Sequence, residues 1–156
     1  MSDFFDDFNE EEFDSEEGKN HRDEKKRMRN HPLFKQAQEI IEVVNSLVES
    51  IKDEGLKEMY GSTMTESAYI ILAKLSGAIT SESYSLAMQN AAIIREHGEY
   101  LRVATSGLHM LDESHTEYII VLRDEMEKFR SLFVEWVKEI QQLNDEMDDE
   151  WGLFLK

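Results

Sequence analysis

The sequence predicts an all-α protein, and three observations lead to that prediction. Apolar residues recur at alternating spacings of three and four over residues 119–147, as on a helix that packs one stripe against other helices. Strong helix formers such as Ala, Leu, Glu, Met and Gln are plentiful, and proline occurs once. Capping and turn residues divide residues 30–148 into four segments with very short links. We therefore expect an antiparallel up-down-up-down four-helix bundle.

The first two helical segments have clear starts and ends. Asn30 is expected to cap the first helix, with Pro32 near its first position, and Asp53-Glu54-Gly55 should end it. The second helix should cover residues 56–79, with Thr80-Ser81 closing it and capping the next. Gly61 and its polar neighbours allow a break or kink early in this second helix.

The third and fourth segments are expected to pack tightly against each other. The third helix, residues 82–111, is rich in small residues, whereas the fourth begins near Asp112 and should end near Asn144. Large residues facing small ones let two helices interdigitate. The seam of the fourth helix consists of Ile119, Leu122, Met126, Phe129, Phe133, Trp136, Ile140, Leu143 and Met147.

The two ends of the chain differ from the bundle in composition. Residues 1–29 are first acidic and then basic and are expected to be a disordered or loosely packed tail, while residues 149–156 form an apolar tag. Either end has two interpretations: a recognition segment that binds a partner, or a segment that remains solvated or covers the end of the bundle. The partner-binding candidates are Phe4, Phe5, Phe8, Phe13, Trp151, Leu153 and Phe154.

The charge and residue content exclude several classes of function. A formal net charge of −17 at pH 7 argues against broad binding to nucleic acid or to an anionic membrane. Only the basic run Lys19–Arg29 leaves nucleic-acid contact open, as a weaker alternative. The absence of cysteine excludes disulfides and thiol catalysis, and the acidic start does not resemble a signal peptide, so we expect a cytoplasmic protein.

Polar residues on the third helix are the candidate ligand site. They lie among its small residues, and Asn90, His97 and Thr105 follow helical spacing along one side, so the set forms either a small polar pocket or a structural network with a neighbour such as Glu66. These candidates are Asn90, Arg95, His97, Glu99 and Thr105. A di-metal helical bundle needs Glu-x-x-His pairs, and the sequence contains none. The most similar pair is Asp112-x-x-His115, so no metal site or cofactor is predicted.

Two stretches resemble a known group of proteins. They are residues 84–95 continuing to Thr105-Ser106, and residues 122–137 together with Asp149-Glu-Trp-Gly-Leu-Phe154. Both are similar to uncharacterised small α-helical proteins of Bacteroidetes-type bacteria, from which Gln89 departs because an acidic residue is usual there. The resemblance implies a bacterial protein and carries no known activity. A looser likeness in architecture is to the four-helix proteins encoded by ribosomal-RNA intervening sequences, which are basic whereas this chain is acidic.

These observations favour a non-enzymatic protein-interaction or assembly module, which would bind a protein partner or a second copy of itself. The alternative is a bundle that binds a small ligand or metal through the polar residues of the third helix, with enzymatic activity left open.

Overall fold

The computed structural model describes residues 16–143 and 151–152, and it confirms the all-α prediction: no strand occurs in that part of the chain. The long helices are α1 (Glu16–Asn30), α2 (Pro32–Ser50), α4 (Ser62–Ala78), α5 (Tyr84–Leu111) and α6 (Thr116–Ile140). Short helical pieces join some of them: α3 (Glu54–Leu56), the π-helical η2 (Lys57–Gly61) and the 3₁₀-helical η3 (Glu113–His115). None of these helices has the length and apolar character needed to cross a membrane.

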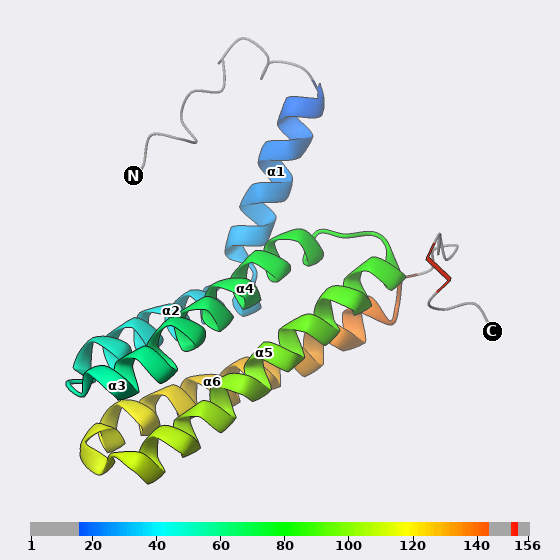
Figure 1. The fold of residues 1–156 in the computed structure, drawn as a ribbon. Helices are drawn as coiled ribbons and strands as arrows, with labels where there is room; N and C mark the ends of the chain where they lie inside the picture. Colours follow the sequence, from blue (N-terminus) through cyan, green and yellow to red (C-terminus); the bar gives the residue numbers. More distant parts are fainter. Residues whose placement is uncertain (1–15, 144–150, 153–156) are drawn as a thin grey trace.

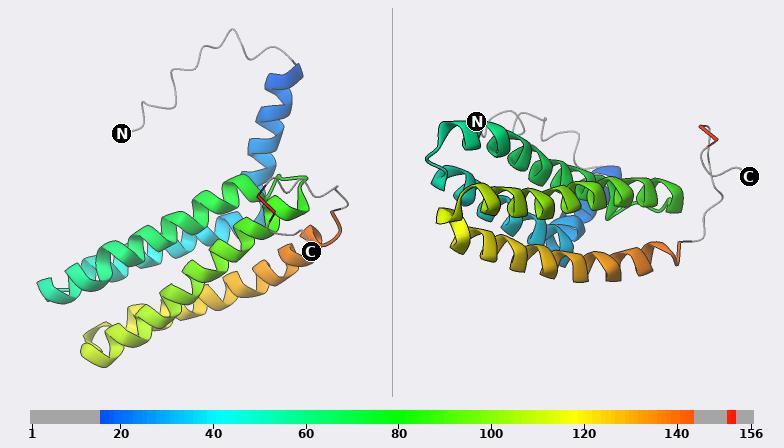
Figure 2. Two further views of the ribbon diagram at one scale, coloured as in Figure 1. Left: turned by 45° about the vertical axis from the view of Figure 1, so that its right-hand side comes forward. Right: turned by 60° about the horizontal axis from the view of Figure 1, so that its bottom comes forward.

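Four of the long helices pack together around one apolar core. Helix α2 contacts α4 and α6, and α5 contacts the same two helices, so each member of the group has two neighbours (Figure 1; Figure 2). All four contribute fully buried side chains, because each has apolar residues on the face turned toward the others. The largest of these are Leu33, Ile40, Leu47, Met64, Ile71, Leu75, Ile94, Leu101, Leu108 and Leu122.

Helix α1 is the main departure from the expected organisation. Residues 16–29, which we expected to lie in a disordered tail, are helical, although α1 buries no residue. Figure 1 shows α1 leaving the side of the packed helices. A proline disfavours helical backbone angles at the residue before it, and His31 accordingly has φ −65° and ψ 131°. His31, and not Asn30 as predicted, caps α2 by accepting a hydrogen bond from the Leu33 amide at 3.2 Å.

A π-helical turn lies where a break or kink was expected in the second helical segment. It occupies Lys57–Gly61 and leads directly into α4. A Cβ on Gly61 would lie 3.0 Å from Val48 Cγ1, so the glycine allows this segment to approach α2 closely.

The boundaries of the last two helices also differ from those predicted. Ser83, rather than Ser81, caps α5 through a hydrogen bond from the Leu86 amide at 3.3 Å. Helix α6 follows the short η3 turn and ends at Ile140, before Asn144.

The seam of α6 faces the core for most of its length. Its buried members are Ile119, Leu122, Phe129, Trp136 and Ile140, whereas Met126, Phe133 and Leu143 are partly buried. Met147 lies outside the described residues. The expected tight packing of α5 against α6 is wrong in one respect: the most extensive contact of α5 is with α4, and a groove separates it from part of α6.

Candidate functional site

The groove between α5 and α6 has an apolar base. Its volume is about 490 Å³, and the apolar residues that line it are Ile94, Gly98, Met126, Phe129 and Phe133. The rings of Phe129 and Phe133 are stacked, with centroids 6.2 Å apart and an interplanar angle of 25°. A Cβ on Gly98 would lie 3.5 Å from Met126 Cε, which is an ordinary contact distance. Because glycine has no side chain, this part of the groove stays unfilled. The base therefore offers aromatic and aliphatic surface to a ligand.

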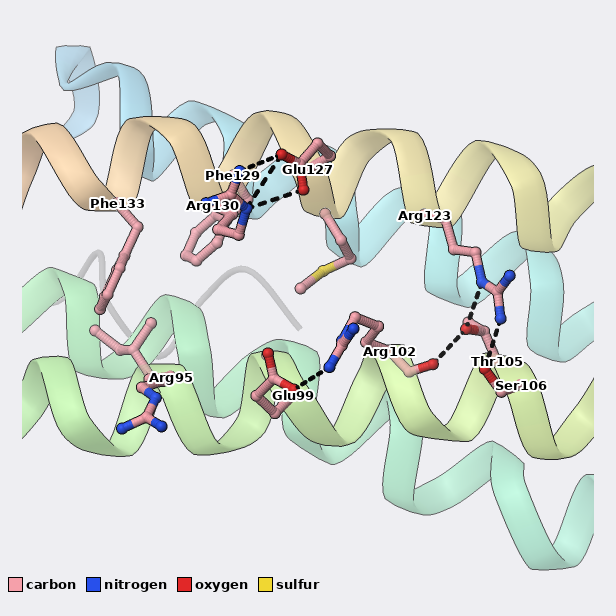
Figure 3. Close-up of a pocket in the computed structure, with 13 residues that line it drawn as sticks. Arg95, Glu99, Arg102, Thr105, Ser106, Arg123, Glu127, Phe129, Arg130 and Phe133 are labelled. Atoms are coloured by element: carbon pink, nitrogen blue, oxygen red, sulfur yellow. Dashed lines mark hydrogen bonds and ion pairs between the residues drawn. The ribbon is translucent and has the colours of Figure 1, made fainter.

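Arginines surround this apolar base. Arg95 and Arg102 come from α5, and Arg123 and Arg130 come from α6 (Figure 3). The three other arginines of the chain all belong to α1, so every arginine after residue 30 lines this groove. Only two carboxylates, those of Glu99 and Glu127, share the lining. The groove is therefore locally basic on a chain whose formal net charge is −17.

Neighbouring side chains hold three of the four guanidinium groups. Arg102 Nη2 lies 2.7 Å from Glu99 Oε2 one helical turn away, and Arg130 pairs with Glu127 in the same way. Arg123 Nε donates to Thr105 Oγ1 at 3.2 Å across the two helices. These contacts fix the direction of the guanidinium groups without burying them, because the arginine side chains remain exposed.

Arg123 and Arg95 have no carboxylate partner in the described part of the chain. The second hydrogen bond of Arg123 goes to Ser106 Oγ at 2.6 Å, and no hydrogen bond or ion pair involves Arg95 among the described residues. A guanidinium that lacks an anionic partner can bind an external carboxylate through two parallel N–H donors. The two arginines lie toward opposite ends of the groove (Figure 3).

The Glu127–Arg130 pair keeps its charges at neutral pH. The hydrogen bond from Arg130 lowers the pKa of Glu127, and the hydrogen bond to Glu127 raises the pKa of Arg130. Both side chains are exposed, at 62% and 63%, so solvent weakens their attraction. An incoming anion can therefore compete for Arg130 at modest cost.

The groove gathers some of the sequence-predicted polar residues and separates others. Arg95, Glu99 and Thr105 line it. His97 instead points to α4, where its Nδ1 lies 3.1 Å from Ser67 Oγ, and Asn90 is partly buried outside the groove lining. The predicted polar set is thus divided between two faces of α5, because His97 is two positions from both Arg95 and Glu99, which is about 200° around a helix.

The two arginines of α6 and Arg102 were missed by sequence reasoning. A signal for them exists: Arg95 and Arg102 are seven positions apart on one helix, and Arg123 and Arg130 are seven apart on the next. A spacing of seven returns a side chain to nearly the same face of a helix, so each pair marks one edge of the groove.

The predicted contact residues at the termini fall mostly outside the described residues. These are Phe4, Phe5, Phe8, Phe13, Leu153 and Phe154. Trp151 is described and is 90% exposed. The basic residues of the run Lys19–Arg29 are all on α1 and all exposed.

Asp112 and His115 form a structural contact at the turn between α5 and α6. His115 Nε2 lies 3.2 Å from Asp112 Oδ2, and its Nδ1 lies 3.1 Å from Ser50 Oγ at the end of α2. His115 is only 4% exposed, so this network attaches the turn to α2. Within residues 16–143 and 151–152, no three or more His, Asp or Glu side chains form a group that could hold a metal ion.

Comparison with known proteins finds no matching protein-family model, no matching curated protein and no matching solved structure.

Proposed function

We propose that the chain is a non-enzymatic interaction module on an antiparallel four-helix bundle, and that its groove binds an acidic protein segment carrying aromatic side chains. The observation that carries this proposal is the gathering of every arginine after residue 30 around one groove of a strongly acidic chain.

The chemistry of the groove selects both features of the proposed ligand. Arg95 and Arg123, which lack carboxylate partners in the described part of the chain, favour a ligand with at least two carboxylates along the groove. The stacked Phe129 and Phe133 favour an aromatic ring that packs against them. Arginine and aromatic side chains are also the residue types that most often dominate binding energy in protein interfaces.

A labelled synthetic peptide of alternating Asp and Phe tests the proposal by fluorescence anisotropy with the full chain. We expect binding that weakens as salt is added, and no binding of the matched peptide of alternating Lys and Phe. Arg95→Ala should weaken binding about tenfold, because it removes charge-assisted hydrogen bonds of about 1.4 kcal/mol in total.

Lys52→Ala is the matched control, since it removes a positive charge from an exposed position outside the groove. It should leave the affinity for the peptide unchanged. Equal binding of the two peptides, or an affinity insensitive to Arg95→Ala, would overturn the proposal.

A small aromatic carboxylate is a second candidate ligand. The groove volume of about 490 Å³ supports it, because small-molecule pockets commonly measure about 300–1,000 Å³. Titration with 1-naphthoate, followed by NMR of the phenylalanine ring signals, tests this candidate. Binding of naphthoate without binding of the acidic peptide would replace the protein ligand by the small molecule.

A further inference from the structure

Charge alternates along the chain in three blocks. Residues 1–15 contain seven Asp or Glu, four Phe and no Lys or Arg, which gives a net charge of −7. Helix α1 has six basic and four acidic residues, which gives +2. Residues 31–156 carry the remaining −12, although the groove on this part is basic. The first block thus has the composition that the groove selects, and the second is attracted to the acidic remainder of the protein.

Helix α1 projects from the packed helices of its own chain. Helix α1 buries no residue and leaves the side of the packed helices (Figure 1; Figure 2). At 1.5 Å per residue, its 15 residues are about 22 Å long. Residues 1–15 are therefore attached at the outer end of a projecting helix, and a fully extended segment of fifteen residues is up to about 50 Å long.

We propose that the occupant of the groove is the N-terminal segment, residues 1–15, of a second copy of the chain. The inference rests on the proposed function and names the partner. In the resulting dimer each chain extends α1 along the acidic body of the other and places its own acidic, phenylalanine-containing segment in the other chain's groove. A two-fold arrangement fills both grooves and leaves neither arm free, so the assembly closes at two copies.

The phenylalanines and aspartates of the N-terminal segment have separate roles in this exchange. Rings from Phe4, Phe5 and Phe8 supply apolar surface for the groove base, and Asp6 and Asp7 lie between them in sequence to meet the arginines. Formation of the first arm–groove contact makes the second one intramolecular. The effective concentration of the second segment then becomes about millimolar, which strengthens a pair of individually weak contacts.

Charge-reversed variants of the full chain test the exchange by sedimentation equilibrium. Arg95→Glu with Arg102→Glu disables the groove, and Asp6→Arg with Asp7→Arg disables the arm. We expect the wild type to dimerise and each variant alone to dimerise at least about tenfold more weakly. An equimolar mixture of the two variants should form a heterodimer, because the intact arm of one meets the intact groove of the other and the arginines of the reversed arm meet the glutamates of the reversed groove.

Controls separate the exchange from loss of folding and from other contacts. Lys52→Glu reverses one charge at an exposed site outside the groove and should dimerise like the wild type. Replacing Phe4, Phe5 and Phe8 by Ser should weaken dimerisation without altering the groove. Far-UV circular dichroism should show the helix content of the wild type for every variant, and the altered groove and control residues (Arg95, Arg102 and Lys52) are exposed.

Three results would overturn the exchange: a wild type that stays monomeric, a dimer insensitive to the phenylalanine substitutions, or a variant mixture without heterodimer. Each is distinct from failure of the proposed function. A monomer that still binds the Asp and Phe peptide keeps the acidic-segment groove and removes only the exchange. A chain that binds neither the peptide nor a second copy removes both.

Discussion

Replacing Gly107 by alanine measures how closely α5 approaches the π-helical segment η2. Alanine inside a helix is normally more stable than glycine by about 0.5–1 kcal/mol. Here the added Cβ would lie 2.6 Å from Tyr60 Oη and 3.3 Å from its Cζ, and real Cβ atoms essentially never come within 3.0 Å of a neighbour. The tyrosine ring or the backbone of η2 must therefore move.

Overpacking of this kind costs about 1–3 kcal/mol, so Gly107→Ala should lower the free energy of unfolding by up to about 2 kcal/mol after the helix-propensity gain. Gly77→Ala is the matched control, because a Cβ at Gly77 would meet nothing within 4 Å. This control should raise stability by about 0.5–1 kcal/mol. Urea denaturation followed by far-UV circular dichroism measures both effects.

Tyr60→Phe in the Gly107→Ala background assigns the cost to the hydroxyl. The substitution removes the atom nearest to the new Cβ and leaves the ring, whose Cζ is 3.3 Å away. Stability should recover most of what was lost, whereas Tyr60→Phe alone should have little effect because its hydroxyl makes no hydrogen bond to the described residues. A Gly107→Ala variant as stable as Gly77→Ala, or a double variant that recovers nothing, would contradict the close contact with Tyr60.

Two further substitutions test the apolar core and the charge of Glu125. Leu101→Ala should lower the free energy of unfolding by about 2–5 kcal/mol in urea denaturation, because the side chain is fully buried. Val103 is exposed, so Val103→Ala should change that free energy by less than about 0.5 kcal/mol. Similar losses at both positions would contradict the described core. Glu125→Gln should make stability less dependent on pH. Hydrogen bonds from Lys128 and then Gln36 lower the pKa of Glu125, so its stabilising contribution is complete above the ordinary glutamate pKa of about 4.3 and is lost as the pH falls through the lowered value. The gap in stability between wild type and Glu125→Gln should therefore be largest at neutral pH and close in acid, and parallel pH profiles would contradict it.

The sequence predicted the helical class and most core positions because both depend on local periodicity. The apolar residues spaced for one helical face, such as Leu33, Ile71 and Leu122, are fully buried. Helix ends were less predictable, because neighbouring serines such as Ser81 and Ser83 have the same capping chemistry and only the backbone angles decide between them. Boundaries therefore shifted by a few residues while the elements remained.

The groove was only partly predictable because it exists between two helices. Arg123 donates to Thr105 across 18 positions of sequence, and nothing local shows that the two side chains face each other. Arg95, Glu99 and Thr105 were identified because they share one helix, yet His97 joined a different interface. A polar set on one helix does not show which neighbour it faces until the packing is known.

Helix α1 was not predicted because its composition does not distinguish a solvent-exposed helix from a disordered segment. Alternating acidic and basic residues occur in unstructured chains and in solvent-exposed helices alike. No apolar stripe marks α1, and it buries none of its residues. Acidic residues in its first turn and arginines in its last suit the helix dipole, and Met28 near its end packs against the core.

The connection between α1 and α2 has a mechanical consequence. His31 is the single residue between the two helices, and without Pro32 they would merge into one straight rod about 50 Å long from Glu16 to Ser50. The Nδ1 of His31 accepts from the Leu33 amide, and its Nε2 lies 3.9 Å from Glu139 Oε2 on α6. The elbow thus lies beside the helix that supplies half of the groove, and because α1 buries no residue, His31 and Pro32 set the direction in which α1 leaves the packed helices.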